Sequence, residues 1–145
     1  MNKKLLFSTP MIVMGLVMIV LGARWMVVDE PWMLDQIANE ERLEMTFDEL
    51  FKADINKTLP DYLRQIYRFF GLWVIIIGLF ITLFSIPKII TNKNIQLILL
   101  FCVGVTVYSG LFLAYILIPS SPFIYLGWIL LILHLVSAVN YKNIK

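Results

Sequence analysis

Three long stretches of the chain contain no Asp, Glu, Lys or Arg, and they constrain the fold more than any other feature. They run from Leu5 to Ala23, from Phe69 to Pro87 and from Asn94 to Tyr141. A helix needs roughly 20 largely apolar residues to cross the hydrocarbon core of a membrane, so the first two stretches each match one crossing and the third matches two. With 60% hydrophobic residues and a mean hydropathy of +0.84, the chain is far more apolar than a soluble domain.

The third stretch divides at Pro119-Ser120-Ser121-Pro122, because each proline removes a backbone donor and disfavours helix at the residue before it. We therefore expect an all-α integral membrane four-helix bundle, a single transmembrane domain over residues 1–145. The expected spans are about 5–27, 66–87, 95–118 and 122–141. Short amphipathic helices are expected in the external loop between the first two spans, over residues of about 28–65.

Charge is sorted by segment, since all ten acidic residues fall between Asp29 and Asp61. The other segments outside the spans carry only basic residues, namely Lys3, Lys4, Lys88, Lys93, Lys142 and Lys145. By the positive-inside rule these segments face the cytoplasm. We expect a multi-pass protein of the cell membrane with both termini cytoplasmic and the acidic loop outside, and the small, lysine-rich chain is typical of a prokaryote.

The first span has one alternative, a cleaved signal peptide, because two lysines precede it and Gly22-Ala23, near its end, could be the small residues of a cleavage site. Its apolar core is longer than the roughly 7–15 residues of a signal peptide, and Leu21 is a poor residue for the third position before a cut. We expect the span to be retained.

The external loop carries three helix-start patterns. Pro31 is placed like a first-turn proline, Thr46 to Glu49 fits a capping box, and Thr58 begins a run that continues into the second span. We expect two short helices over the outer face and a second membrane helix that projects about two turns beyond the bilayer. The acidic side chains form a solvated face on these helices, with a cation-binding or partner-binding surface as the alternative.

Glycines in the first two spans share one spacing. Gly15 and Gly22, like Gly71 and Gly78, are separated by seven residues, which is two helical turns and therefore one face. Small residues on one face let helix backbones approach closely in a membrane. These faces are predicted to pack against neighbouring helices.

Few side chains in the spans could carry chemistry. A single cysteine, Cys102, and a single histidine, His134, supply too few ligands for a disulfide, zinc or haem site within one chain, so we expect no metal and no cofactor. Cys102 is interpreted as a small packing residue. His134 is the intramembrane polar residue, expected to be buried, neutral and hydrogen-bonded to Ser137 or to Tyr and Thr side chains of the third span; a ligand-binding or proton-handling role is the alternative.

The candidate ligand-binding residues gather at the outer end of the first two spans: Arg24, Tyr67, Arg68 and Trp73. Arg24 and Arg68 are expected at the same depth, where two cations tolerate each other only around an anion. A loop carboxylate would make a structural clamp, whereas an amphipathic ligand would make a binding site. Over this site we expect an apolar lid of Trp32, Leu34, Phe47, Leu50 and Phe51.

The layout of the chain resembles the DoxX-like group of small four-helix bacterial membrane proteins. The resemblance is carried by the long first loop, by His134 in the last span, and by the sequence that opens the second span, Leu63-Arg64-Gln65-Ile66-Tyr67-Arg68-Phe69-Phe70-Gly71. In that group an Arg-x-x-Tyr stretch followed by glycine opens the second helix. The resemblance implies a four-helix fold, and members linked to oxidoreductases act as membrane partners.

The sequence favours a non-enzymatic integral membrane protein, an accessory or partner subunit of a membrane complex. The alternative is a binder or carrier of a lipophilic or amphipathic small molecule within the helix bundle. An enzyme would need chemistry from a cofactor or a second chain, because no span contains Asp or Glu and no catalytic motif is present. The expected partners are the lipid bilayer, a membrane protein or a second copy of the chain, and a lipophilic ligand; the scattered basic residues exclude nucleic acid.

Overall fold

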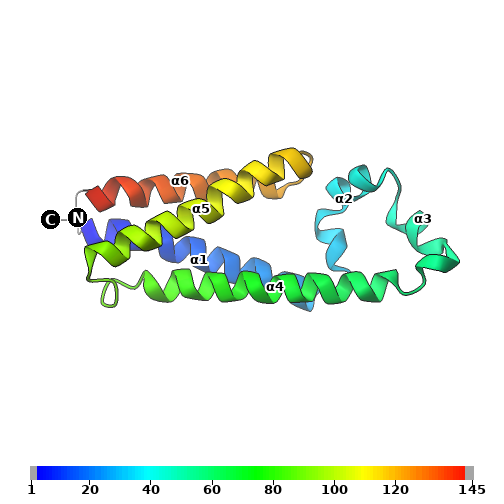
Figure 1. The fold of residues 1–145 in the computed structure, drawn as a ribbon, viewed down its shortest axis with the longest axis horizontal. Coiled ribbons are helices and arrows are strands. Elements are labelled where there is room, and N and C mark those ends of the chain that lie inside the picture. The colour runs from blue at the N-terminus through cyan, green and yellow to red at the C-terminus, as the bar shows by residue number, and fades with distance from the viewer. Residues whose placement is uncertain (1–2, 143–145) are drawn as a thin grey trace.

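The structure, a computed structural model, describes residues 3–142, and within them it is helical without strands. Four helices are long and apolar enough to cross a membrane: α1 (Lys3–Val27), α4 (Leu59–Phe84), α5 (Lys93–Leu117) and α6 (Phe123–Lys142). Four short elements join α1 to α4: η1 (Pro31–Asp35), α2 (Gln36–Leu43), α3 (Phe47–Lys52) and η2 (Asp54–Asn56). They lie at one end of the long helices, the loop end, and α1 begins at the other, the terminal end (Figure 1).

Two pairs of glycines hold α1 and α4 backbone against backbone. A Cβ atom added at Gly22 would lie 2.5 Å from the carbonyl oxygen of Gly71, and one added at Gly78 would lie 2.6 Å from that of Gly15. The glycine faces predicted to pack therefore pack against each other. The helices are antiparallel, so each seven-residue step along α1 matches one along α4 and the register is fixed at two levels.

The same register reaches a third pair of small residues, Ser8 and Ser85. One further step of seven residues leads to Ser8 in α1 and to Ser85 immediately after α4, and both are buried. Neither hydroxyl has a hydrogen-bond partner in the described part of the chain. Close contact between the two helices thus extends from the loop end to the terminal end.

The four long helices pack in the spatial order α4, α1, α6, α5. Helix α1 packs on both α4 and α6, and α5 packs on α6, whereas α4 and α5 are barely in contact although they are consecutive in the chain. The core lies toward the terminal end and consists of Phe7, Met11, Met14, Ile81, Ile90, Leu100, Val103 and Val107. No residue of α5 after Val107 is buried, and α5 rises away from α4 toward the loop end (Figure 1).

The start of α3 has the capping box expected at Thr46. The Thr46 hydroxyl accepts from the Glu49 backbone N–H at 3.2 Å, and the Glu49 carboxylate accepts from the Thr46 backbone N–H at 2.9 Å. The backbone bond and then the hydroxyl bond from Thr46 hold the pKa of the Glu49 carboxyl below its ordinary value. The cap fixes where the chain turns back toward α4.

The segment after Pro31 differs from the single helix expected there. It forms the short 3-10 helix η1, and Asp35, with φ −133°, separates it from α2. This change of helix type rotates the following residues around the axis. Ile37, which follows this break, is 70% exposed.

Glycine-to-alanine changes should weaken the contact between α1 and α4. We expect Gly22→Ala and Gly78→Ala each to lower the free energy of unfolding in detergent by about 1–3 kcal/mol, because the atom nearest to the added methyl is a backbone carbonyl oxygen, which cannot turn aside as a side chain can. Gly110→Ala is the matched control, since a Cβ there meets nothing within 4 Å. Helix propensity makes that change neutral or stabilising by up to about 1 kcal/mol. Equal losses in all three variants would contradict the glycine contact.

Candidate functional site

The loop is hydrogen-bonded across the loop end to the turn between α5 and α6. The Ser121 hydroxyl donates to the Asp35 carboxylate at 2.8 Å, and the Ser120 hydroxyl donates to the Glu41 carboxylate. On the other side, Arg64 of α4 donates through Nε to the backbone carbonyl of Asp29 at 2.8 Å. These bonds hold η1 and α2 as a bridge between α4 and the α5–α6 turn.

A cavity of about 350 Å³, here called the lid chamber, lies between the bridge and the start of α4. Its floor is one face of α4, where Leu59, Leu63 and Tyr67 follow at four-residue steps. The remaining lining residues come from η1, α2 and α3: Trp32, Asn39, Arg42, Leu43, Phe47 and Leu50. The chamber has the size and the mainly apolar lining of small-molecule sites, which span about 300–1,000 Å³.

Asn39 and an aromatic cluster fix the walls of the lid chamber. The Asn39 amide donates to the backbone carbonyl of Trp32 at 2.9 Å and to the hydroxyl of Tyr67 at 3.3 Å. The Trp32 ring, 2% exposed, lies with its centroid 5.5 Å from that of Phe51 and 6.2 Å from that of Phe47. Because these side chains are packed and bonded, the chamber is largely formed before any ligand arrives.

A second cavity, here called the apolar cleft, lies where α4 and α5 separate. Its volume is about 230 Å³, and all four long helices line it. The lining residues are Met18, Leu21, Trp25, Phe70, Val74, Thr106, Val107, Gly110, Leu111, Ala114, Phe123, Leu126, Gly127 and Leu130. None of these side chains is ionisable, so the cleft can hold an apolar group but offers no acid or base.

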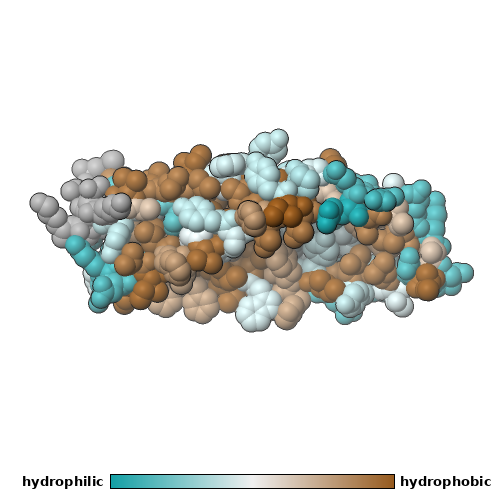
Figure 2. Space-filling view, turned by 45° about the horizontal axis from the view of Figure 1, so that its top comes forward, coloured by the Kyte–Doolittle hydropathy of each residue, from teal (hydrophilic) through white to brown (hydrophobic). Residues whose placement is uncertain are grey.

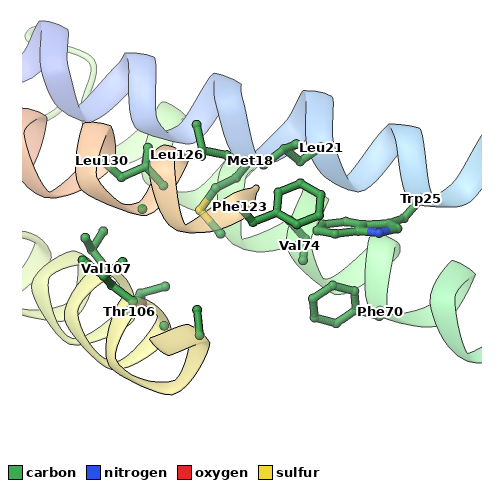
Figure 3. Close-up of a pocket in the computed structure, with 14 residues that line it drawn as sticks. Met18, Leu21, Trp25, Phe70, Val74, Thr106, Val107, Phe123, Leu126 and Leu130 are labelled. Atoms are coloured by element: carbon green, nitrogen blue, oxygen red, sulfur yellow. The ribbon is translucent and has the colours of Figure 1, made fainter. Parts of the chain in front are cut away.

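Three aromatic rings close the loop end of the apolar cleft. The Trp25 centroid lies 5.0 Å from that of Phe70 and 5.3 Å from that of Phe123, so side chains of α1, α4 and α6 meet there. Figure 3 shows these rings gathered at one end of the cleft, with Thr106 and Val107 of α5 across the opening. Phe70 and Val74 continue along α4 from Tyr67 at three- and four-residue steps, so neighbouring parts of α4 line both cavities.

The structure does not bring the two arginines expected at the site together. The glycine register places Arg24 level with Phe69 and Arg68 level with Trp25, so their depths are similar. Arg24, however, lies two residues after Gly22, about 200° around α1 from the face that meets α4. In residues 3–142 neither arginine forms an ion pair or a side-chain hydrogen bond, so no carboxylate clamp is present.

The other two candidate residues, Tyr67 and Trp73, also lie in different surroundings. Tyr67 lines the lid chamber, whereas Trp73 is 51% exposed and contacts Phe69, with ring centroids 6.0 Å apart. Among the expected lid residues, Trp32, Phe47 and Leu50 line the chamber. Leu34 does not line it, and Phe51 lies beyond Trp32 and Phe47, at a smaller cavity.

Sequence reasoning missed the chamber residues that come from α2. Asn39, Arg42 and Leu43 are three and four residues apart, which places them on one face of a helix. The same spacing would have identified these residues in the sequence if the helix had been taken to begin at Gln36. Arg64 also holds the loop, since it donates to the backbone carbonyl of Asp29 and pairs with Asp61 at 3.0 Å.

His134 is 5% exposed and lies between α5 and α6. Its Nε2 lies 2.9 Å from the Leu100 backbone carbonyl, which can only accept, and its Nδ1 lies 2.8 Å from the Tyr108 hydroxyl. A neutral imidazole that donates through Nε2 and accepts through Nδ1 satisfies both bonds. Gly104 makes room for the ring, since a Cβ there would lie 3.0 Å from the imidazole.

Two expectations about this region are corrected. Ser137 is not a partner of His134, because its hydroxyl donates to the Phe7 carbonyl of α1 at 3.0 Å. Cys102 is exposed on α5, not packed between helices, since α5 has only one closely packed neighbour, α6. Both corrections follow from the helix order. It places α6, with Ser137, against α1, and it leaves most of α5 uncovered.

Comparison of the chain with protein-family models, with curated proteins and with solved structures gave no match. A function for this chain is therefore inferred from the geometry of the two cavities.

Substitutions at His134 should show whether its hydrogen bonds or its size contribute to the stability of the fold. We expect His134→Gln to have a small effect, since an amide can both donate and accept, and His134→Leu to lower the free energy of unfolding by about 1–2 kcal/mol because Tyr108 loses its acceptor. Denaturant titration in detergent measures both. Equal losses for Gln and Leu would show that the hydrogen bonds contribute nothing.

Proposed function

We propose that the protein crosses a membrane four times and binds a lipophilic molecule in the apolar cleft. Apolar side chains predominate along the middle of the molecule and hydrophilic ones gather toward its two ends, as Figure 2 shows. Both termini lie on the cytoplasmic side in this proposal, because the segments at the terminal end carry basic residues and no acidic ones, whereas all the acidic residues lie in the loop. The loop end then lies outside, as in a multi-pass protein of a prokaryotic cell membrane.

The observation that carries the proposal is the separation of α4 from α5. Membrane helices associate mainly by close packing, so a space of about 230 Å³ between helices favours an occupant that restores the lost contacts. The glycine contacts hold α4 against α1, on the side of the cleft that faces α5. They therefore prevent α4 from moving across the cleft toward α5. The lining supports an apolar chain or ring system as occupant.

A second candidate function is that of a partner subunit, which agrees with the resemblance to the DoxX-like group. In this case a helix of another protein fills the space between α4 and α5. The loop-end half of α5 favours it, since no residue after Val107 is buried and α6 is the only closely packed neighbour.

Filling the cleft tests which occupant is present. After extraction in mild detergent, native mass spectrometry of the wild-type chain should show a small apolar molecule at fixed ratio, and Gly110→Phe should abolish its retention. Leu113→Phe is the matched control, because Leu113 is 50% exposed on the same helix and does not line the cleft. A protein retained at fixed ratio would support the partner subunit, and no retained species would contradict both functions.

Cysteine labelling tests the proposed orientation. In a Cys102→Ser background, Ile55→Cys in the loop and Ile89→Cys between α4 and α5 are suitable sites, since these side chains are 90% and 56% exposed. A membrane-impermeant maleimide should label position 55 in intact cells and position 89 only after permeabilisation. The reverse pattern would overturn the proposed topology.

A further inference from the structure

Charge is distributed unevenly around the lid chamber. All ten acidic residues of the protein lie in or beside the loop, yet none lines the chamber, and its only ionisable side chains are Arg42 and Tyr67. Arg42 forms no ion pair or side-chain hydrogen bond within residues 3–142. An arginine surrounded in sequence by carboxylates thus lines the chamber without a carboxylate partner.

Three of the neighbouring carboxylates are engaged elsewhere. Glu40 accepts from Gln36 and from the backbone of Phe47, and Glu41 and Asp35 accept from the serines of the α5–α6 turn. Glu30, Glu40 and Asp48 line a separate cavity of about 130 Å³ on the other side of Trp32 and Phe47. The aromatic cluster thus separates an acidic cavity from a chamber whose one charged group is a cation.

We propose that the lid chamber binds an anionic amphiphile, with its carboxylate, phosphate or sulfate head on Arg42 and its apolar chain inside the chamber. Guanidinium pairs with such heads through parallel hydrogen bonds and keeps its charge at all relevant pH values. Leu43, Leu50, Leu59 and Leu63 offer the chain an apolar surface, and burying it releases water from both. This inference goes beyond the proposed function and does not depend on the apolar cleft.

Position along α4 gives this ligand two sources. Leu59 lies eleven residues before Phe70, or roughly 16 Å farther from the cleft along the helix. The chamber therefore lies beyond the aromatic rings that close the cleft, at the loop end. The amphiphile can be an anionic lipid of the bilayer or a free single-chain anion that arrives from the water.

Quenching of Trp32 tests the chamber directly, because this side chain lines it. The full chain, with Trp25, Trp73 and Trp128 changed to Phe, is placed in nanodiscs of phosphatidylcholine. One arm adds dibromostearate, and the other includes phosphatidylglycerol with brominated chains. We expect quenching in at least one arm, and the arm that quenches identifies the source.

Charge removal supplies the specific readout. In the quenching arm, Arg42→Gln should weaken binding on the order of tenfold. Lys52→Gln is the matched control, since it removes the same charge from the lid at an exposed residue that does not line the chamber. In the dibromostearate arm, the methyl ester should also bind on the order of tenfold more weakly than the acid.

Three results would overturn the inference: no quenching in either arm, equal effects of Arg42→Gln and Lys52→Gln, or equal binding of acid and ester. Because Arg42 is exposed and unpaired, its variant should unfold at the same temperature as the parent, and a large decrease would count against the assigned role. Gly110→Phe should leave Trp32 quenching unchanged, so the chamber and the cleft can fail separately.

Discussion

The arrangement of the molecule depends on the direct contact between the backbones of α1 and α4. Two glycine pairs bring the helices so close that an added Cβ atom would meet a carbonyl oxygen of the opposite helix at 2.5–2.6 Å. In lipid, where apolar surfaces have no water to avoid, such packing is the main source of attraction between helices. Because α4 packs on one side of α1, the remaining helices pack on the other side. The space between α4 and α5 therefore stays open.

The open space and the loop create two different chemical environments along α4. Near the middle of the helix, Phe70 and Val74 face a cleft without ionisable groups. Nearer its start, Leu59, Leu63 and Tyr67 face a chamber with amide, phenol and guanidinium groups at its walls. The loop makes this difference, because its bonds to Arg64 and to Ser121 hold α2 over the start of α4.

The sequence predicted the long helices and part of the site, for identifiable reasons. Apolar stretches and prolines predict the long helices, because an apolar segment in lipid must satisfy its own backbone hydrogen bonds, as a helix does, and a proline interrupts that pattern. Glycine spacing predicted two packing faces, but the sequence alone does not show which faces pair, or that Gly22 opposes Gly71. Trp32 and Tyr67, which were expected beside one cavity, both line the chamber, whereas Arg42 was not expected there. Arg24 and Arg68 were expected together from their depth, but depth along a helix does not give the direction around it.

The helix order also has a consequence for how the protein is made. Helix α1 is synthesised first, yet both of its partners, α4 and α6, come later, and the Ser137 hydroxyl reaches the carbonyl of Phe7 across 130 positions of sequence. Contacts between distant parts of a chain form slowly, because the intervening segment must be ordered first. The glycine face of α1 is therefore uncovered until α4 has been synthesised. The polar partner of Phe7 arrives only with the last helix, so the tertiary structure is completed at the end of synthesis.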